Sequence, residues 1–273
     1  MFVVTSSRGV LDLDGRTWDF GRVCTLALFL HQSAVRPLVI AANRDEFYRR
    51  PATDPMPVAE EDPWIVAGLD LVAGGTWFGV NRYGLTVGIL NRRTPYPIDP
   101  TRSSRGALCL DALRCADVGE ALQLVQGARG DDYNPFNLLV ASPARAFVAQ
   151  NHGCDISVRE LPPGVHVLTN LDLNDPTCPR IAKSHQLFDA LRSKLDGDAS
   201  LLVQALRGVL TDHSTPLDPR GGIIENLCVH LGEYGTRSSS IVLHSSEEPR
   251  LRYFHASGAP CENEYREVEL PHT

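Results

Sequence analysis

Three polar features of this chain have the residue types that acyl transfer requires. Cys24 heads the apolar run Cys24–Leu30, so its thiol is a candidate nucleophile. The tetrad Asn43-Arg-Asp-Glu follows a second apolar run, and Arg237 stands just before a third. A thiol, a carboxylate and two guanidinium groups are parts of a site that attacks a carbonyl and stabilises the charge that develops there.

Two asparagines extend this set. Asn91 ends one apolar run, and Asn170 ends the run Val165-His-Val-Leu-Thr-Asn. Each offers amide N–H donors at the end of a predicted strand, where an oxyanion could be bound. Each residue also has an ordinary interpretation. An asparagine at a strand end is more often a turn residue, the tetrad can be a solvated turn, and a cysteine in an apolar strand is often part of the core.

Short apolar runs between Gly-rich turns predict strands, and two amphipathic stretches between them predict pairs of helices. The predicted strands cover residues 24–30, 37–42, 64–67, 74–81, 84–91, 136–141, 146–151, 165–169, 237–244 and 251–255. The predicted helices cover residues 105–115, 118–126, 179–195 and 200–210, with Ser103 or Ser104 and Asp117 as caps of the first two. Runs of one element type predict an α+β fold with two antiparallel sheets packed together and helices outside.

Composition excludes several functional classes. The 273 residues carry a net charge of −7 with no basic cluster, so no nucleic-acid partner is expected. No stretch reaches the roughly 18 apolar residues of a membrane span, and residues 1–23 do not form a signal peptide. Seven cysteines without a CxxC pair argue against a disulfide framework and against a zinc ribbon. We therefore expect a cytoplasmic protein with reduced thiols, no metal and no cofactor.

Several motifs, taken in order, resemble the NRDE family, which is also called the transport and Golgi organisation protein 2 family. The resemblance covers about residues 23–257. Besides Cys24, the motifs are Ala41-Ala-Asn-Arg-Asp-Glu-Phe-Tyr-Arg-Arg-Pro, Gly74-Gly-Thr-Trp-Phe-Gly, Asn91-Arg-Arg, Ser104-Arg-Gly, Phe136-Asn-Leu, Leu168-Thr-Asn and Tyr234-Gly-Thr-Arg-Ser-Ser-Ser. That family is distantly similar to the choloylglycine hydrolase and penicillin V acylase group of N-terminal-nucleophile (Ntn) hydrolases. The resemblance implies a four-layer αββα sandwich with an N-terminal cysteine.

The resemblance raises a question about the start of the chain, because the family usually begins Met-Cys and here Val23 precedes Cys24. Residues 1–23 are expected to be either a propeptide that is removed to free Cys24 or the product of a wrongly assigned start, with Val23 read as the initiator Met. We favour the second explanation. Residues 24–273 then form a single domain.

The resemblance also implies roles for individual residues. Asn91, Asn170 and Arg237 fit the hydrolase pattern well, and the two asparagines would donate to the oxyanion. Arg44 would lower the pKa of the Cys24 thiol, Asp45 would hold the α-ammonium group, and Arg237 would order the site or pair with a substrate carboxylate. The α-amino group, with an ordinary pKa of about 7.7 to 8.0, would accept the thiol proton, so that no histidine base is needed.

Arg44 and Asp45 fit less well, because the hydrolases separate this Arg and Asp by two residues and neighbours on a strand point to opposite faces. Either a bulge brings both side chains inward, or Asn43 acts with Asp45 or with Glu46. The candidate substrate contacts are Asn43, Glu46 and Trp77. The expected substrate is a small acyl-amide or acyl-thioester, with specificity set by loops at about 92–104 and 212–226.

A second function class remains open at this stage. The resemblance also implies links to haem or acyl-lipid handling, so the protein could be a binding or trafficking factor on the same scaffold, with haem as a ligand. Cys178-Pro179 is a candidate haem-ligand dipeptide, although a Cys-Pro pair in a turn is much commoner. Trp64, Trp77 and Phe78 could line an apolar pocket, but core packing explains them equally well.

Overall fold

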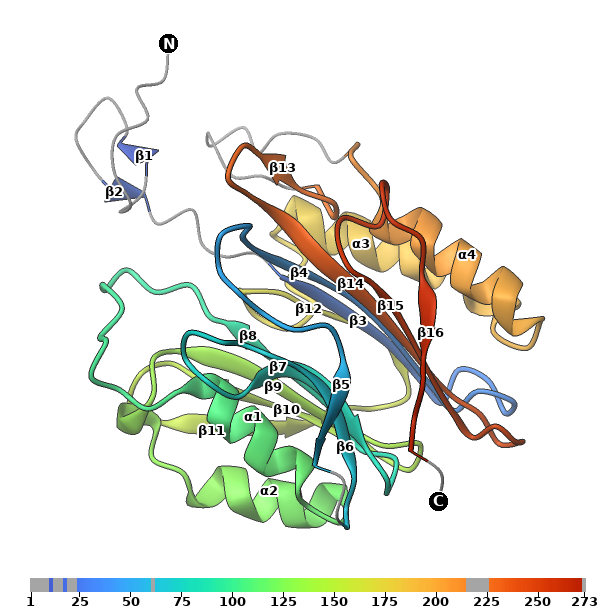
Figure 1. Ribbon diagram of the computed structural model, residues 1–273, viewed down its shortest axis with the longest axis horizontal. Coiled ribbons are helices and arrows are strands. Elements are labelled where there is room, and N and C mark those ends of the chain that lie inside the picture. Colours follow the sequence, from blue (N-terminus) through green and yellow to red (C-terminus); the bar gives the residue numbers. More distant parts are fainter. Residues whose placement is uncertain (1–9, 12–16, 19–23, 60–61, 215–225, 272–273) are drawn as a thin grey trace.

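The computed structural model describes residues 10–11, 17–18, 24–59, 62–214 and 226–271. Two antiparallel sheets lie face to face, and a pair of helices covers the outer face of each sheet (Figure 1). This four-layer αββα arrangement confirms the predicted α+β sandwich. Most of residues 1–23, for which a propeptide or a wrongly assigned start is predicted, lie outside the described part; two short strands there, β1 (Val10–Leu11) and β2 (Thr17–Trp18), pair with each other.

The first sheet contains the strand that follows Cys24. Its central strand β4 is paired on one side with β3 and on the other with β14, and the whole order is β12-β3-β4-β14-β15-β16, with β13 added beside β14. The strands are β3 (Thr25–Leu30), β4 (Leu38–Phe47), β12 (Gly164–Leu168), β13 (His230–Leu231), β14 (Tyr234–His244), β15 (Leu251–Ala256) and β16 (Arg266–Val268).

The second sheet is a meander of neighbouring strands in the order β11-β10-β9-β8-β7-β6-β5. Its strands are β5 (Met56–Ala59), β6 (Ile65–Leu69), β7 (Thr76–Asn81), β8 (Thr86–Asn91), β9 (Phe136–Ala141), β10 (Ala146–Asn151) and β11 (Ile156–Glu160). The predicted hairpin of residues 74–91 is formed by β7 and β8.

Helices α1 (Arg105–Leu113) and α2 (Val118–Gly127) cover the second sheet, and α3 (Pro179–Asp189) and α4 (Ala199–Leu210) cover the first (Figure 1). Asp117 caps α2 as predicted, since its side chain accepts from the backbone N–H groups of Gly119 and Glu120. Two short 3₁₀ turns, η1 (Gly130–Asp132) and η2 (Arg192–Lys194), complete the elements. Helix α3 is shorter than predicted, because the chain turns after Asp189 and η2 replaces its last turn.

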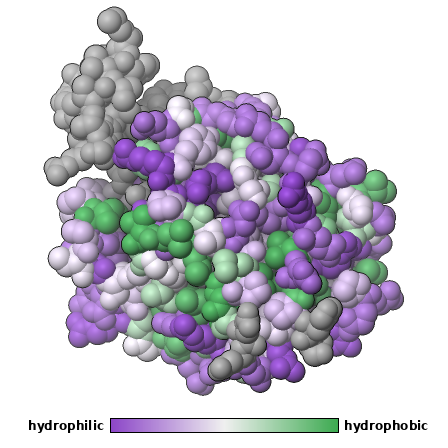
Figure 2. Space-filling model, viewed as in Figure 1, coloured by the Kyte–Doolittle hydropathy of each residue, from purple (hydrophilic) through white to green (hydrophobic). Residues whose placement is uncertain are grey.

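Strand alternation sorts the core into layers. On β3, Leu26, Leu28 and Leu30 pack between the two sheets, whereas Ala27 and Phe29 face α3 and α4. Burying the alternate residues on both faces explains why β3 is apolar throughout. Several apolar groups also reach the surface; Figure 2 shows them in separate patches among polar residues.

The prediction that the second strand ends before Asn43 is wrong. β4 continues through the whole polar tetrad and ends at Phe47, because β14 pairs with it from Leu38 to Phe47. The tetrad is therefore part of the sheet rather than a loop, and its side chains alternate between two buried faces. Among the described helices, none is both long and apolar enough to cross a membrane.

Candidate active site

Cys24 lies directly before β3 and belongs to the core between the sheets, together with Leu26. It is 9% exposed, and its Sγ lies 3.7 Å from the backbone carbonyl oxygen of Asp45, to which it donates a hydrogen bond. Burial, followed by the negative charge of Asp45, raises the pKa of the thiol to about 12. With residues 1–23 attached, the thiol is therefore protonated at neutral pH and is a poor nucleophile.

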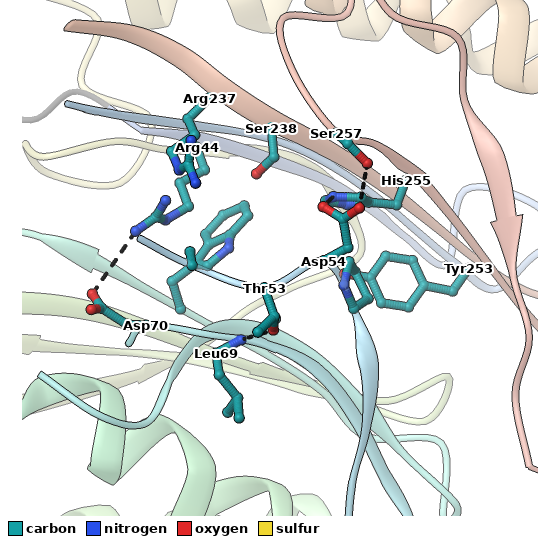
Figure 3. A pocket seen from close by; sticks show the side chains of 14 residues that line it. Arg44, Thr53, Asp54, Leu69, Asp70, Arg237, Ser238, Tyr253, His255 and Ser257 are labelled. Carbon is teal, nitrogen blue, oxygen red and sulfur yellow. Dashed lines mark hydrogen bonds and ion pairs between the residues drawn. The ribbon is translucent and has the colours of Figure 1, made fainter. Parts of the chain in front are cut away.

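Arg44 lies on the same face of the first sheet as Cys24. It is buried, and its guanidinium reaches across to the second sheet, where Nη2 lies 3.9 Å from Oδ2 of Asp70 (Figure 3). The positive charge of Arg44 lowers the pKa of the Cys24 thiol, but by less than burial raises it. Arg44 is thus a cation near the thiol, and its role in catalysis stays a prediction.

Asp45 points the other way, into the layer between the first sheet and α3. It is 1% exposed; Oδ1 accepts from Thr236 Oγ1 at 2.6 Å, and Oδ2 accepts from Arg180 Nη2 at 3.3 Å. The same Arg180 nitrogen donates to Thr25 Oγ1 at 2.6 Å. Burial raises the pKa of the Asp45 carboxyl to about 6, although Arg180 and Thr236 oppose this shift.

A β-bulge opposite these residues settles which of them share a face. Asp45 pairs with Thr236 and Arg44 pairs with Ser238, so Arg237 is the extra residue on β14. The bulge lies on the partner strand and not on β4, and it leaves Arg44 and Asp45 on opposite faces. Arg237 lines the same pocket as Arg44, and its Nη1 donates to the Tyr48 carbonyl at 3.3 Å.

Asn43 and Glu46, the other two members of the tetrad, have partners of their own. Asn43 Nδ2 donates to the carbonyls of Leu210 and Leu227, and its Oδ1 accepts from Ser239, so this amide joins β4 to the end of α4. That contact set lies on the helix side, away from the Cys24 thiol. Glu46 accepts from the backbone N–H of Phe47 and lies 3.7 Å from Arg50, beside the Arg44–Asp70 pair. The contacts of Asn43 and Glu46 with substrate stay predictions.

Asn170 lies at the same end of the first sheet as Cys24. The last register pair of β12 and β3 is Leu168 with Leu26, so Asn170 follows this pair by two residues and Cys24 precedes it by two. Asn170 is 3% exposed, and among the described residues its Nδ2 has no hydrogen-bond partner. A buried amide without a protein partner is a candidate donor to a bound ligand group.

Asn137, which the sequence reasoning missed, holds Asn170 in place. Its Nδ2 donates to the carbonyls of Thr169 and Leu171, both at 2.7 Å, and so fixes the backbone on each side of Asn170. Asn137 comes from β9 in the second sheet, so these bonds also join the two sheets. The signal in the sequence was the single polar residue within the apolar run Phe136–Ala141.

Asn91 is close to this region, but its side chain is placed differently. Alternation along β8 puts Asn91 on the same side as Ile89, which packs against α1 and α2, whereas Leu90 faces the first sheet. The segment after Asn91 does contact the site, since the backbone N–H of Arg93 donates to the Asn170 carbonyl at 2.8 Å. The backbone that follows Asn91 therefore contacts the residue proposed to bind the oxyanion, whereas the side-chain amide of Asn91 lies on the other face of β8.

A pocket with a cavity volume of about 60 Å³ lies beside Arg44 and Arg237 (Figure 3). Arg44 and Arg237 lie next to each other at one end, and Asp54, His255 and Ser257 lie at the other. Trp77 lines this pocket, and its predicted contact with substrate stays a prediction, whereas Trp64 and Phe78 belong to the core between the sheets. Two neighbouring guanidinium groups favour an anionic group of a ligand.

Arg180 is the most informative residue that the sequence reasoning missed. It is 2% exposed, and it joins α3 to both β3 and β4 through Thr25 and Asp45. Its position one helical turn before the buried Ser184 and two turns before the buried Phe188 marks it as facing the sheet. Cys178 and Pro179, by contrast, simply begin α3, with proline at a position that helices prefer.

Comparison with known proteins places this chain among proteins of one family. The family model described as Transport and Golgi organisation 2 matches residues 23–257. The Transport and Golgi organization protein 2 homolog of Bos taurus is 31% identical over 234 residues, which cover 76% of this chain and 81% of that protein. The Homo sapiens homolog is 30% identical over 233 residues with the same coverage.

Solved structures with the same architecture are hydrolases. A Caenorhabditis elegans N-acylethanolamine-hydrolyzing acid amidase ortholog is 15% identical with a TM-score of 0.54, over 81% of this chain and 92% of that chain. Penicillin V acylase from Agrobacterium tumefaciens is 13% identical with a TM-score of 0.48, over 90% and 86% of the two chains. At this identity the first likeness shows a shared fold, that of the Ntn hydrolases.

Proposed function

Since this chain belongs to the Transport and Golgi organisation 2 family and has the Ntn-hydrolase fold, we propose that Cys24, as the first residue of the chain, attacks the carbonyl of a small acyl-amide or acyl-thioester. One observation carries this proposal. Arg44 is a cation close enough to lower the pKa of the Cys24 thiol, and the buried amide of Asn170, which has no partner among the described residues, lies toward the same end of the first sheet.

The first chemical step uses the new amino terminus. The α-amino group of Cys24 takes the thiol proton, and the thiolate adds to the substrate carbonyl carbon. Asn170 Nδ2 donates to the oxyanion that forms, which gives this amide the partner that it lacks among the described residues. The ammonium proton then passes to the leaving amine or thiol, the C–N or C–S bond breaks, and an acyl group remains on Sγ until water or an acceptor removes it.

The surrounding charges support this step. The Arg44 guanidinium favours the thiolate form of Cys24. Asp45 has its carboxylate oxygens bonded to Thr236 and Arg180, so it orders β4 from the opposite face and favours the protonated amine through its charge. Arg237 and Arg44 together would bind an anionic group on the substrate, and Trp77 would contact its apolar part.

The test compares a protein that begins at Cys24, released from a cleavable fusion, with the 273-residue chain. At pH 7 we expect iodoacetamide to alkylate Cys24 of the shortened protein faster than a free peptide thiol, because the free amine and Arg44 lower the thiol pKa. In the full chain Cys24 should react slowly, because its pKa is about 12. A Cys154→Ser variant controls for labelling of an exposed thiol.

Turnover is then measured on acyl-amides and acyl-thioesters, with and without a carboxylate. We expect turnover that is lost in Cys24→Ser and in Cys24→Ala and that favours carboxylate-bearing substrates. Alkylation of Cys24 no faster than a peptide thiol would overturn the proposal. A shift of the haem Soret band on titration, without turnover of any substrate, would instead support the binding function.

A further inference from the structure

Four potential metal ligands from three distant segments meet beside β13. They are His213, which follows α4, Cys228 and His230 around the start of β13, and Cys261, which precedes β16. Their ligand atoms all lie within 4.8 Å of one another. Cys228 is buried, Cys261 is half-buried and the two histidines are exposed, so the cluster lies at the protein surface with its thiols inward.

Three separations within the cluster are close to those of a tetrahedral zinc site. With Zn–S bonds of about 2.3 Å and Zn–N bonds of about 2.0 Å, the edges of the tetrahedron are about 3.8 Å between sulfurs and about 3.5 Å between sulfur and nitrogen. Here the two Sγ atoms are 3.5 Å apart, and His230 Nε2 lies 3.6 Å from Cys228 Sγ and 3.2 Å from Cys261 Sγ. The sulfurs are well beyond the roughly 2.05 Å of a disulfide bond.

The fourth residue, His213, has a hydrogen bond of a kind common in metal-binding histidines. His213 Nδ1 lies 3.0 Å from the Cys228 carbonyl, to which it can donate a hydrogen bond. Such a bond from the second ring nitrogen to a backbone carbonyl fixes the tautomer of metal-binding histidines and leaves Nε2 as the coordinating atom. The His213 and His230 rings lie next to each other, with their centroids 5.3 Å apart.

We propose that His213, Cys228, His230 and Cys261 bind one zinc ion. Two thiolates neutralise the charge of the ion, and two neutral imidazoles complete a tetrahedral set of borderline and soft ligands, which excludes the oxygen-seeking Ca²⁺ and Mg²⁺. Four protein ligands leave no position for substrate, so the role of the ion is structural. The spacing in the sequence hides this set, because no CxxC pair occurs and the ligands come from three separate segments.

A zinc ion at this site would fix the segment that is hydrogen-bonded to Thr236, and Thr236 in turn binds Asp45. Val229 lies between two of the ligands, and its backbone N–H donates to Thr236 Oγ1 at 2.9 Å, while the Thr236 N–H donates to the Val229 carbonyl at 2.8 Å. Thr236 in turn donates to the Asp45 carboxylate. Zinc at this position would therefore fix β13 against β14 and stabilise the environment of Asp45.

The test measures metal in the full-length protein, purified under reducing conditions without a metal-affinity tag. We expect stoichiometric zinc by mass spectrometry of the elements. Replacement by Co²⁺ should give thiolate-to-cobalt charge-transfer bands and the intense visible bands of tetrahedral cobalt. Both signals should be lost in Cys228→Ser and Cys261→Ser and retained in Cys154→Ser, which removes an exposed thiol elsewhere.

Chelation of the wild-type protein provides a second readout, which does not depend on the folding of any variant. We expect a chelator to abolish the cobalt bands and to lower the melting temperature, and added zinc to restore both. Absence of zinc and of cobalt bands in the wild-type protein would overturn the proposal. So would a Cys228–Cys261 disulfide found by mapping the unreduced protein, or full metal content in the Cys228→Ser/Cys261→Ser variant.

Discussion

At the scale of single residues, the state of Cys24 depends on what is attached to it. Its side chain is buried and its pKa is raised to about 12, mainly by the loss of solvent. Arg44 opposes this shift, and a free α-amino group at Cys24 would oppose it further. Asn170 complements the thiol, because it is a buried donor without a partner among the described residues.

Replacing Asn170 by Asp tests the proposed oxyanion donor. The substitution keeps the shape of the side chain but removes the amide N–H, so we expect kcat of the Cys24-started protein to fall by about 100- to 1000-fold, or roughly 3 kcal/mol of barrier, with little change in KM. The measurement is steady-state kinetics on the best substrate. Gln123→Glu, the same amide-to-carboxylate change on the exposed face of α2, should leave kcat unchanged; a similar kcat in both variants would contradict the role of Asn170.

At the scale of elements, the two faces of β4 carry side chains with different partners. Arg44 faces the space between the sheets, whereas Asn43 and Asp45 face the helix layer. Arg180 on α3 and Thr236 on β14 hold Asp45 from two sides, and the bulge at Arg237 brings that residue to the Arg44 side. The junction of β3, β4, β14 and α3 therefore determines the geometry at the end of the strand that Cys24 precedes.

Replacing Arg180 by Met should destabilise the fold more at pH 7 than at pH 5. In the wild-type protein the pKa of Asp45 is raised to about 6, so the stability that protonated Asp45 contributes is complete at low pH and is lost as the pH rises through 6. Removing the guanidinium raises this pKa further and leaves an unpaired buried carboxylate at pH 7. We expect a loss of about 3–5 kcal/mol there and clearly less at pH 5.

Urea unfolding at both pH values measures this difference. Arg192→Met removes an exposed pair with Asp189 and should cost less than about 1 kcal/mol at either pH. An equal loss at pH 5 and pH 7 in Arg180→Met would show that the Asp45 carboxylate does not respond to Arg180.

At the scale of the whole molecule, the site lies between two sheets. All the described strands of both sheets come after Cys24 in the chain. β3 is paired on both sides, by β4 and by β12, and its apolar residues are covered by the second sheet and by α3 and α4. Bonds such as those from Asn137 to the turn around Asn170 tie the two sheets together at the site.

A protein that begins at Cys24 should therefore fold as stably as the 273-residue chain. We expect the free energies of unfolding in urea to agree within about 1 kcal/mol, because the pairing of β3 needs nothing before Cys24. A loss of several kcal/mol on shortening would show that the preceding residues belong to the folded domain, and it would count against both explanations of residues 1–23 given above.

The family and most of the elements can be recognised from the amino-acid sequence alone. Alternating and continuous apolar runs marked most of the strands, Asp117 marked the start of α2, and the ordered motifs from Cys24 to Arg237 indicated the fold, because these signals are local in the chain. The strands β5, β11, β13 and β16 escaped notice. Three of them span only two to four residues, which carry too little pattern, and β11 has no fully buried residue.

Which side chains share a face, and which segments meet, is seen only in the folded protein. Arg44 and Asp45 are adjacent in the sequence and yet lie on opposite sides of a sheet, and the bulge that places Arg237 is visible only in the pairing of β14 with β4. Arg180 and Asp45, 135 residues apart, pair because α3 packs on β4. Cys228 and Cys261 meet for a similar reason. Long-range packing, which no local pattern encodes, brings such residues together.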